Sequence, residues 1–342
     1  MDHTILEIGL ALGLIAFAVV LAARLGISNV PFLIVIGMLV GPHAPKIGAF
    51  DFSFVNTQAL ITFMGRMGVL FLLFYLGLES SISRLMKAGK SIVVGGVLYI
   101  GINFLVGLLY AFLLGFAMRE TLVVAGVTTI SSSAIVAKIL FDYRRTANRE
   151  TELILGITMF EDIFLAIYLS LISGIVLSGA TSLSGVAMSG GIALAFIVGL
   201  IAAGQFARPL LERLFRISSS EIFIIVVFAS LFLLAGLGET IHVAEAIGAL
   251  LLGLVLGDTS HSDRMEKLVI PFRDFFGAIF FFSFGLSIDP FTLGGAVWYA
   301  IGAAILSLIG VTVAGLIVGR RAELSGVGSL NIGFTLLARG EF

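Results

Sequence analysis

Long apolar segments separated by short polar breaks fill this chain from one end to the other. A helix needs about 20 predominantly apolar residues to cross a bilayer, and most of these segments approach or exceed that length. The pattern therefore predicts an all-α polytopic membrane protein with twelve helices. The predicted spans are roughly 5–24, 29–41, 59–78, 91–117, 120–141, 151–177, 185–205, 220–237, 243–257, 270–287, 294–318 and 326–342.

Polar residues interrupt two of these spans near their middles. The span 120–141 contains a run of Thr and Ser over 128–133, and the span 326–342 contains Ser329 and Asn331 among glycines. Hydroxyl side chains compete for backbone hydrogen bonds and tolerate unwinding. Unwound backbone at membrane depth must line a cavity or be buried in protein. We expect two discontinuous helices, although small polar residues can also serve close helix packing alone.

Basic residues alternate between the two sides of the predicted topology. Of the 20 Lys and Arg residues, 14 lie in loops that follow odd-numbered spans, and only Lys46 and Arg119 lie in the other loops. Cytoplasmic loops carry the Lys/Arg excess. The pattern predicts that the odd loops are cytoplasmic and that the N-terminus is outside. The membrane we expect is the cell (inner) membrane.

Two halves of the chain resemble each other in sequence. The segment 37–41 (GMLVG) has a counterpart at 253–257 (GLVLG), 74–80 resembles 282–287, and the polar segment from Gly126 resembles the one from Gly326. These matches pair the second, third and fifth spans with the ninth, tenth and twelfth. The offset of seven helices is odd, so the repeats must have opposite topology. Inverted repeats with interrupted helices are typical of secondary transporters.

Composition removes several classes of function. Apolar residues make up 59% of the chain and charged residues 12%, whereas soluble domains carry about 25% charged residues. The lipid bilayer is thus the expected surrounding. A net charge of −1 gives no case for nucleic acid, and four histidines without cysteine make a zinc site improbable. No phosphate loop or nucleophile triad is present in the sequence, so we expect no enzyme and no cofactor.

Two adjacent carboxylates, Glu161 and Asp162, lie within an apolar span. Ionisable residues inside the membrane are costly and mark ion or proton pathways. Two acids together repel each other, so one can take up a proton or a desolvated cation near neutral pH. One of the two can therefore face an ion path while the other faces a partner helix, and the family resemblance described below implies that Asp162 binds the cation or the proton while Glu161 adjusts its proton affinity. Structural neutralisation by basic partners is the alternative.

Further polar residues are candidates for the same site. Hydroxyl and backbone oxygens from the first broken helix are expected to bind the ion, and residues of the second broken helix, together with an acid at the end of the third span, are expected to support it. The oxygen donors are Thr129, Ser131 and Ser132, and the supporting residues are Asn331, Arg339, Glu341 and Glu79. For Glu79 and for Arg339 with Glu341, a position at the membrane interface is the alternative. Arg66 and Glu245 are expected to have structural partners.

These motifs resemble those of a known family. The segments are 31–42 (PFLIVIGMLVGP), 76–79 (LGLE), 131–136 (SSSAIV), 160–163 (FEDI) and 338–342 (ARGEF), which run in order along the whole chain. They resemble the Kef/Kht-type branch of the monovalent cation:proton antiporters, and within it the KhtU-type potassium–proton antiporters. The resemblance places the essential carboxylate of the family on Asp162.

The resemblance also implies an architecture. It predicts a sodium/proton-antiporter-like fold with two crossing discontinuous helices, about 12 helices present of an expected 13, and an elevator movement. It predicts a homodimer and a soluble cytosolic regulatory subunit. Scaffold helices are expected within about 1–58 and 206–260, core helices within about 59–178 and 268–342, and a linker helix at about 185–205. The chain stops inside an apolar segment, so we expect a C-terminal truncation.

The function expected from sequence is exchange of a monovalent cation, K⁺ in preference to Na⁺, for H⁺. Two other functions remain open. The first is a sodium-coupled organic-anion symporter or channel-like conduit on the same fold, which would not need the Glu-Asp pair. The second is a membrane sensor or assembly factor that transports nothing. Proton-flux measurements with different ions separate the three.

Overall fold

A computed structural model describes residues 4–44, 58–79, 89–132, 148–177, 209–240 and 245–338, with isolated positions between these ranges. Within them the chain is helical and contains no strand. The fold predicted from the apolar segments is confirmed. The helices are α1 (Thr4–Leu25), α2 (Val30–Val40), α3 (Gln58–Glu79), α5 (Lys90–Leu113), α6 (Met118–Val127), α8 (Arg149–Leu177), α10 (Ser220–Thr240), α11 (Glu245–Gly257), α12 (Ser262–Ser287), η1 (Pro290–Gly295), α13 (Ala296–Arg321) and α14 (Gly326–Thr335).

Six helices in the described part of the chain are long and apolar enough to cross a membrane: α1, α3, α5, α10, α12 and α13. The shorter apolar helices α2 and α11 match the two spans that were short in sequence. Two bounds differ from expectation. α12 begins at Ser262 rather than near 270, because the helix continues through its charged first turns. α6 stops at Val127, and the residues that follow are not helical.

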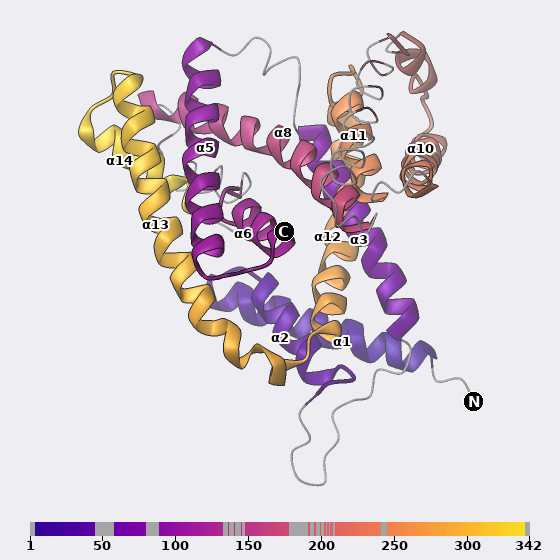
Figure 1. Ribbon diagram of the computed structural model, residues 1–342. Coiled ribbons are helices and arrows are strands. Elements are labelled where there is room, and N and C mark those ends of the chain that lie inside the picture. The colour runs from indigo at the N-terminus through magenta and orange to yellow at the C-terminus, as the bar shows by residue number, and fades with distance from the viewer. Residues whose placement is uncertain are drawn as a thin grey trace.

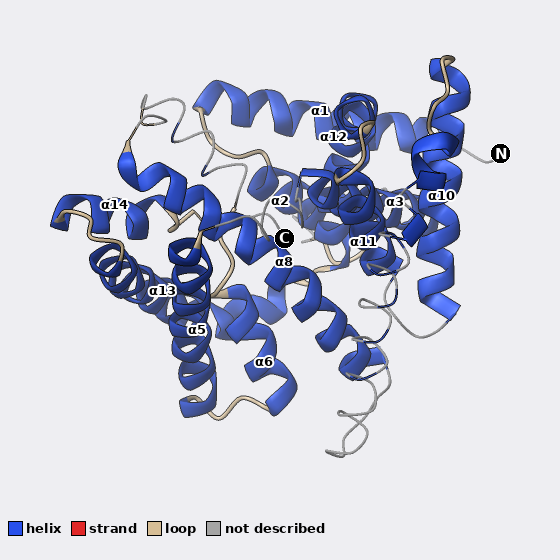
Figure 2. Cartoon of the chain, turned by 90° about the horizontal axis from the view of Figure 1, so that it is seen from above, coloured by secondary structure: helices blue, strands red, loops and turns tan. Residues whose placement is uncertain are grey.

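The helices pack as two sets. The first, called the α3 set, contains α1, α2, α3, α10, α11 and α12, and the second, called the α8 set, contains α5, α6, α8, α13 and α14. In Figure 1, α5, α13 and α14 of the α8 set lie on the left, α3, α10, α11 and α12 of the α3 set lie on the right, and α1 and α2 lie at the bottom. Seen from above, α13 and α14 again lie on the left and α10 on the right (Figure 2). α8 extends from its own set to α11 in the other. Each set is packed more tightly within itself than against the other.

The packing corrects the division expected from sequence at two helices. We expected 59–178 and 268–342 to form one core, which would have placed α3 and α12 beside α5 and α13. Instead α3 and α12 pack on each other and on α11 and α2. The physical reason is the row of glycines and apolar residues that these four helices share. Most of the expected linker helix at 185–205 lies outside the described residues.

Two glycine pairs join the repeats inside the α3 set. A β-carbon on Gly37 of α2 would lie 3.0 Å from the Cα of Gly285 in α12, and one on Gly77 of α3 would lie 2.8 Å from the Cα of Gly253 in α11. Gly37 and Gly253 are equivalent in the sequence repeat, as are Gly77 and Gly285. The same contact is therefore made twice, which confirms the inverted repeat.

The apolar interior follows these sets. One cluster of buried side chains lies between α3, α10, α11 and α12 and includes Phe71, Phe74 and Phe223. A second lies between α5, α8, α13 and α14 and includes Tyr99, Ile154 and Ile157. The second cluster includes Ile332 of α14 and Leu336 in the segment that follows it, so it packs beside the candidate site.

Candidate functional site

The first interruption follows α6. Residues 128–132 leave the helix, and the two threonines satisfy carbonyls at its end. The Oγ1 of Thr129 donates to Ala125 O at 2.6 Å, and that of Thr128 donates to Val124 O at 2.9 Å. Hydroxyl side chains of this kind replace the partners that a helix end lacks. Thr129, Ser131 and Ser132 are all buried.

The end of α14 meets this interruption. α14 begins at a Ser325 cap, whose Oγ accepts from the Gly328 N–H at 3.0 Å, and ends at Thr335. The N–H of Ser132 donates to Ala338 O at 2.7 Å. We call residues 128–132 and 336–338 the crossover. This backbone hydrogen bond joins the segment that follows α6 to the segment that follows α14, which agrees with the crossing that the family resemblance implied.

The acid pair of α8, Glu161 and Asp162, follows next in the site, and Glu161 contacts the crossover. Glu161 is fully buried, and its Oε1 accepts a hydrogen bond from Ser131 Oγ at 3.1 Å. Asp162 is 7% exposed. Neighbouring residues of a helix point about 100° apart, so the two acids face different directions. The structure therefore brings Ser131 to Glu161; Ser132 is the next residue along the chain, and Asp162 follows Glu161 on the same helix.

The electrostatic environment of the crossover favours a cation. α6 and α14 both direct their C-terminal ends toward it. Each helix C-terminus carries a partial negative charge equivalent to about half an elementary charge. Discontinuous helices use such ends and free carbonyl groups to bind Na⁺ or H⁺ in transporters. No group of three or more acidic or histidine side chains suited to a metal ion occurs among the described residues.

Asn331 lies on α14 but bonds to a different acid of α8. Its Nδ2 donates to Glu150 Oε1 at 2.8 Å, and Asn148 Nδ2 donates to the same oxygen at 3.3 Å. Glu150 lies in the first turn of α8, three turns before Glu161. The structure thus places Asn331 at the start of α8 rather than at the acid pair.

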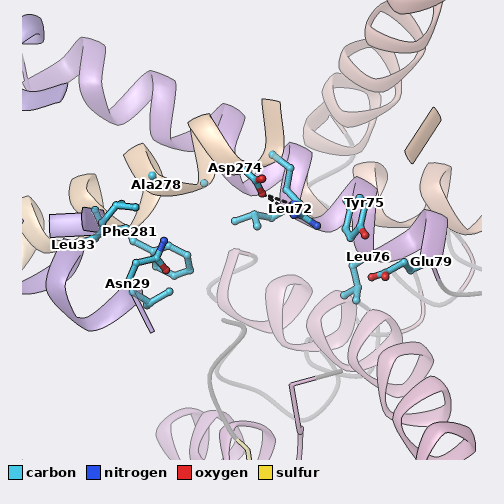
Figure 3. A pocket seen from close by; sticks show the side chains of 13 residues that line it. Asn29, Leu33, Leu72, Tyr75, Leu76, Glu79, Asp274, Ala278 and Phe281 are labelled. Atoms are coloured by element: carbon cyan, nitrogen blue, oxygen red, sulfur yellow. Dashed lines mark hydrogen bonds and ion pairs between the residues drawn. The ribbon is translucent and has the colours of Figure 1, made fainter. Parts of the chain in front are cut away.

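Glu79 lies in the α3 set, at the edge of a cavity. The cavity has a volume of about 550 Å³ between α1, α2, α3 and α12, and its polar lining consists of Asn29, Tyr75, Glu79, Arg273 and Asp274. Figure 3 shows Glu79 and Tyr75 at one end of it and Asn29 at the other. Arg273 donates to Asp274 at 2.7 Å and lies 4.1 Å over the Tyr75 ring. The lining contains neither Glu161 nor Asp162.

Arg66 has the partner that the sequence analysis required. Its Nε and one terminal nitrogen bond the two oxygens of Glu245, each at 2.7 Å, and a terminal nitrogen lies 3.3 Å from Glu239. This bidentate pair ties α3 to α11. Two other predicted residues, Arg339 and Glu341, lie outside the described residues.

Sequence reasoning missed two residues of this region. Glu150 begins a helix beside basic residues, so it looks like an ordinary surface charge. Tyr99 is fully buried on α5, and its hydroxyl donates to Leu336 O in the crossover at 3.4 Å. A polar aromatic residue within an apolar span was the signal that could have indicated it.

Comparisons with known proteins agree with this geometry. Residues 11–342 match the family model described as sodium/hydrogen exchanger, transmembrane. The chain belongs to this family of cation/proton antiporters and is an integral membrane protein. The family is one of transporters.

Individual relatives make the comparison more specific. The chain is 61% identical, over 342 residues, to the K⁺/H⁺ antiporter subunit KhtU of Bacillus subtilis, and the match covers 100% of this chain and 84% of that protein. It is 28% identical to the ammonium/H⁺ antiporter subunit AmhT of Alkalihalophilus pseudofirmus, covering 98% and 83%.

A solved structure shares the fold. The sodium proton antiporter MjNhaP1 of Methanocaldococcus jannaschii superimposes with a TM-score of 0.69 at 19% identity, covering 96% of this chain and 82% of that one. At this identity the likeness concerns the fold alone.

Proposed function

We propose that this protein exchanges K⁺ for H⁺ across the cell membrane, with Asp162 binding the cation and the proton in turn. The observation that carries the proposal is the position of the buried acids of α8 at the crossover, where Ser131 bonds Glu161. Glu161 adjusts the proton affinity of Asp162, and oxygens of Thr129, Ser131 and Ser132 complete the cation site. Asn331 and Glu79 act from outside the immediate site.

The chemistry follows from burial. A carboxylate held away from water is stabilised by either a proton or a cation, since an isolated charge in a low-dielectric medium is costly. Binding both at once would place an uncompensated positive charge near the acid. The proton and the metal ion therefore compete, and that competition couples their movements in opposite directions.

The choice of K⁺ rests on relatives. The relative at 61% identity is named as a K⁺/H⁺ antiporter subunit, while one at 28% identity is named for ammonium. Oxygen ligands from one acid and several hydroxyl and carbonyl groups suit any monovalent cation, so Na⁺ is the competing substrate. Because the first relative is described as a subunit, we further propose a soluble cytosolic regulatory partner.

The movement we propose is an elevator movement of one helix set against the other. Support comes from the tight packing within each set and the limited contact between them through α8 and α11. In this proposal the α8 set carries the ion site, and the α3 set forms the scaffold of a homodimer. The basic loops face the cytoplasm and the N-terminus faces outside.

The test is a cation-specific proton-flux assay on the full-length protein in proteoliposomes. K⁺ is expected to dissipate an imposed pH gradient, Na⁺ less so, and an organic anion not at all. Asp162→Asn is expected to abolish the flux, because the amide cannot exchange a proton. Glu152→Gln is the matched control, since Glu152 is an exposed acid on the same helix.

Three results would contradict the proposal. Unchanged flux in Asp162→Asn would show that Asp162 is not the residue that binds the cation and the proton. A response to the organic anion with sodium supports a symporter. Absence of flux with every cation supports a protein that does not transport.

A further inference from the structure

Two residues at equivalent positions of the inverted repeat each donate a hydrogen bond to α8. Ser131 follows α6 and Asn331 lies in α14, and the repeat aligns them through the pairing of Gly126 with Gly326. Ser131 Oγ donates to Glu161 Oε1 at 3.1 Å, and Asn331 Nδ2 donates to Glu150 Oε1 at 2.8 Å. Each broken helix therefore has its own glutamate on the same helix.

The two glutamates lie on one face of α8. They are 11 residues apart, which is three turns and about 16 Å along the axis. Ile154 and Ile157 lie one turn from each glutamate on the same face, and both are fully buried. Two buried isoleucines therefore lie between the two acids on this face. The separation argues against Glu150 as a relay for the ion, and favours a role in holding the helices.

The contacts form a closed circuit. Glu150 is bonded to Asn331 of α14. Three residues after the end of α14, the carbonyl of Ala338 accepts a hydrogen bond from Ser132 N at 2.7 Å. From Ser132 the circuit returns through the neighbouring Ser131 to Glu161 on α8. The helix fixes the distance between Glu150 and Glu161. A shift of α14 at its contact with Glu150 would therefore also shift Ser131 relative to Glu161.

The surroundings of Glu150 are consistent with a residue that holds the start of α14 against α8. Its second oxygen, Oε2, lies 3.6 Å from where a β-carbon on Gly328 would be, so the carboxylate touches the first turn of α14. A negative charge is favourable at a helix N-terminus. Gly328 N–H is occupied by the Ser325 cap, so the directed hydrogen bond comes from Asn331.

We propose that Glu150 is a positioning residue which, through Asn331, sets the height of the crossover on α8 so that Ser131 meets Glu161. The inference rests on the cation/proton exchange proposed above, because it assigns that exchange a further residue. Glu150 itself binds no transported ion.

Transport kinetics test the positioning role. Glu150→Ala and Asn331→Ala are each expected to raise the KM for K⁺ about tenfold, as for loss of a hydrogen bond to a charged group. The double variant is expected to be no worse than either single one, because both remove the same contact. Glu150→Gln keeps an acceptor for Asn331 and is expected to stay within about threefold of the wild type. Glu152→Ala is the matched control.

A swap variant separates positioning from general damage. Glu150→Asn combined with Asn331→Glu exchanges donor and acceptor and is expected to bring the KM most of the way back from the raised value of the single variants to that of the wild type. A merely structural contact would lower the amount of folded protein and leave the KM unchanged. An unchanged KM in both alanine variants overturns the inference, whereas retained flux in Asp162→Asn overturns the proposed function instead.

The position of the crossover can be measured directly, because the chain contains no cysteine. Ser132→Cys with Ala338→Cys places two thiols on hydrogen-bonded backbone segments, within the range of a disulfide formed by copper-phenanthroline oxidation. The cross-linked fraction is expected to fall severalfold on adding Glu150→Ala or Asn331→Ala, and to stay constant with Glu152→Ala. An equal yield in all backgrounds overturns the inference.

Discussion

Gly37 of α2 faces Gly285 of α12 at backbone contact, with a β-carbon on Gly37 only 3.0 Å from the Cα of its partner. The repeat-related pair, Gly77 of α3 and Gly253 of α11, makes the same contact at 2.8 Å. Approach this close is available only to residues without a side chain, as in the small-residue contacts of membrane helices. These contacts make the α3 set a single packed body.

Substitution of Gly285 tests that contact. Gly285→Ala is expected to destabilise the protein by about 1–3 kcal/mol, because the new methyl group meets backbone rather than a movable side chain. The measurement is the unfolding temperature of purified protein in detergent. Gly236→Ala is the control, since nothing lies within 4 Å of a β-carbon there. An equal effect of the two substitutions would show that the close contact is not formed.

Ser131 supplies the directed hydrogen bond to the acid pair. Ser131→Ala is expected to weaken K⁺-dependent proton flux about tenfold or more, because a hydrogen bond to a charged group contributes about 1.5–3 kcal/mol. Ser230→Ala removes a hydroxyl that bonds only its own helix, at Val226 O, and should leave the flux intact. Wild-type flux in Ser131→Ala would remove Ser131 from the cation site.

The ion pair between Arg66 and Glu245 is open to a double-mutant cycle. Either single alanine variant is expected to lower the unfolding temperature. The decrease in the double variant is expected to be smaller than the sum of the two single decreases. A coupling of roughly 1 kcal/mol is expected, because Arg66 is half-exposed. Glu239→Ala should have the smaller effect, since its distance to Arg66 is longer. Strict additivity would show that the pair contributes nothing.

Asn103 of α5 packs directly against Gly310 of α13, so a side chain at position 310 would clash with it. A β-carbon on Gly310 would lie 2.9 Å from Asn103 Oδ1, and the Asn103 amide is held by a hydrogen bond to Tyr99 O at 2.9 Å. Gly310→Ala is therefore expected to cost about 1–3 kcal/mol of stability. Adding Asn103→Ala should recover part of it, as measured by thermal unfolding. If Asn103→Ala restores no stability to Gly310→Ala, the clash with Asn103 is not the cause of the destabilisation.

The helices and the broken segments could be predicted from sequence for clear physical reasons. Apolar length predicts spans, and hydroxyl residues over 128–133 predict unwinding. The adjacent acids at 161 and 162 stand out because charge is rare at membrane depth. These signals are local, so a single segment carries each of them.

The remaining features depend on contacts between distant segments. The bond between Glu150 and Asn331 joins positions 181 residues apart, and neither residue is unusual in its own segment. The grouping of α3 with α11 and α12 follows from which glycines meet, and the sequence repeat does not state this. Hence the boundary between the two helix sets was misplaced at α3 and α12, although the motifs themselves were recognised.

The glycine pairs also constrain biosynthesis. Both contacts join the first quarter of the chain to residues 253 and 285, so the early hydrophobic segments enter the membrane long before their partners are translated. Their glycine-lined faces contact lipid or insertion factors until the partner segments have been synthesised and inserted. Assembly of this body is consequently late and non-local, and translational pausing before residue 250 would lengthen the interval in which the nascent protein is vulnerable to degradation.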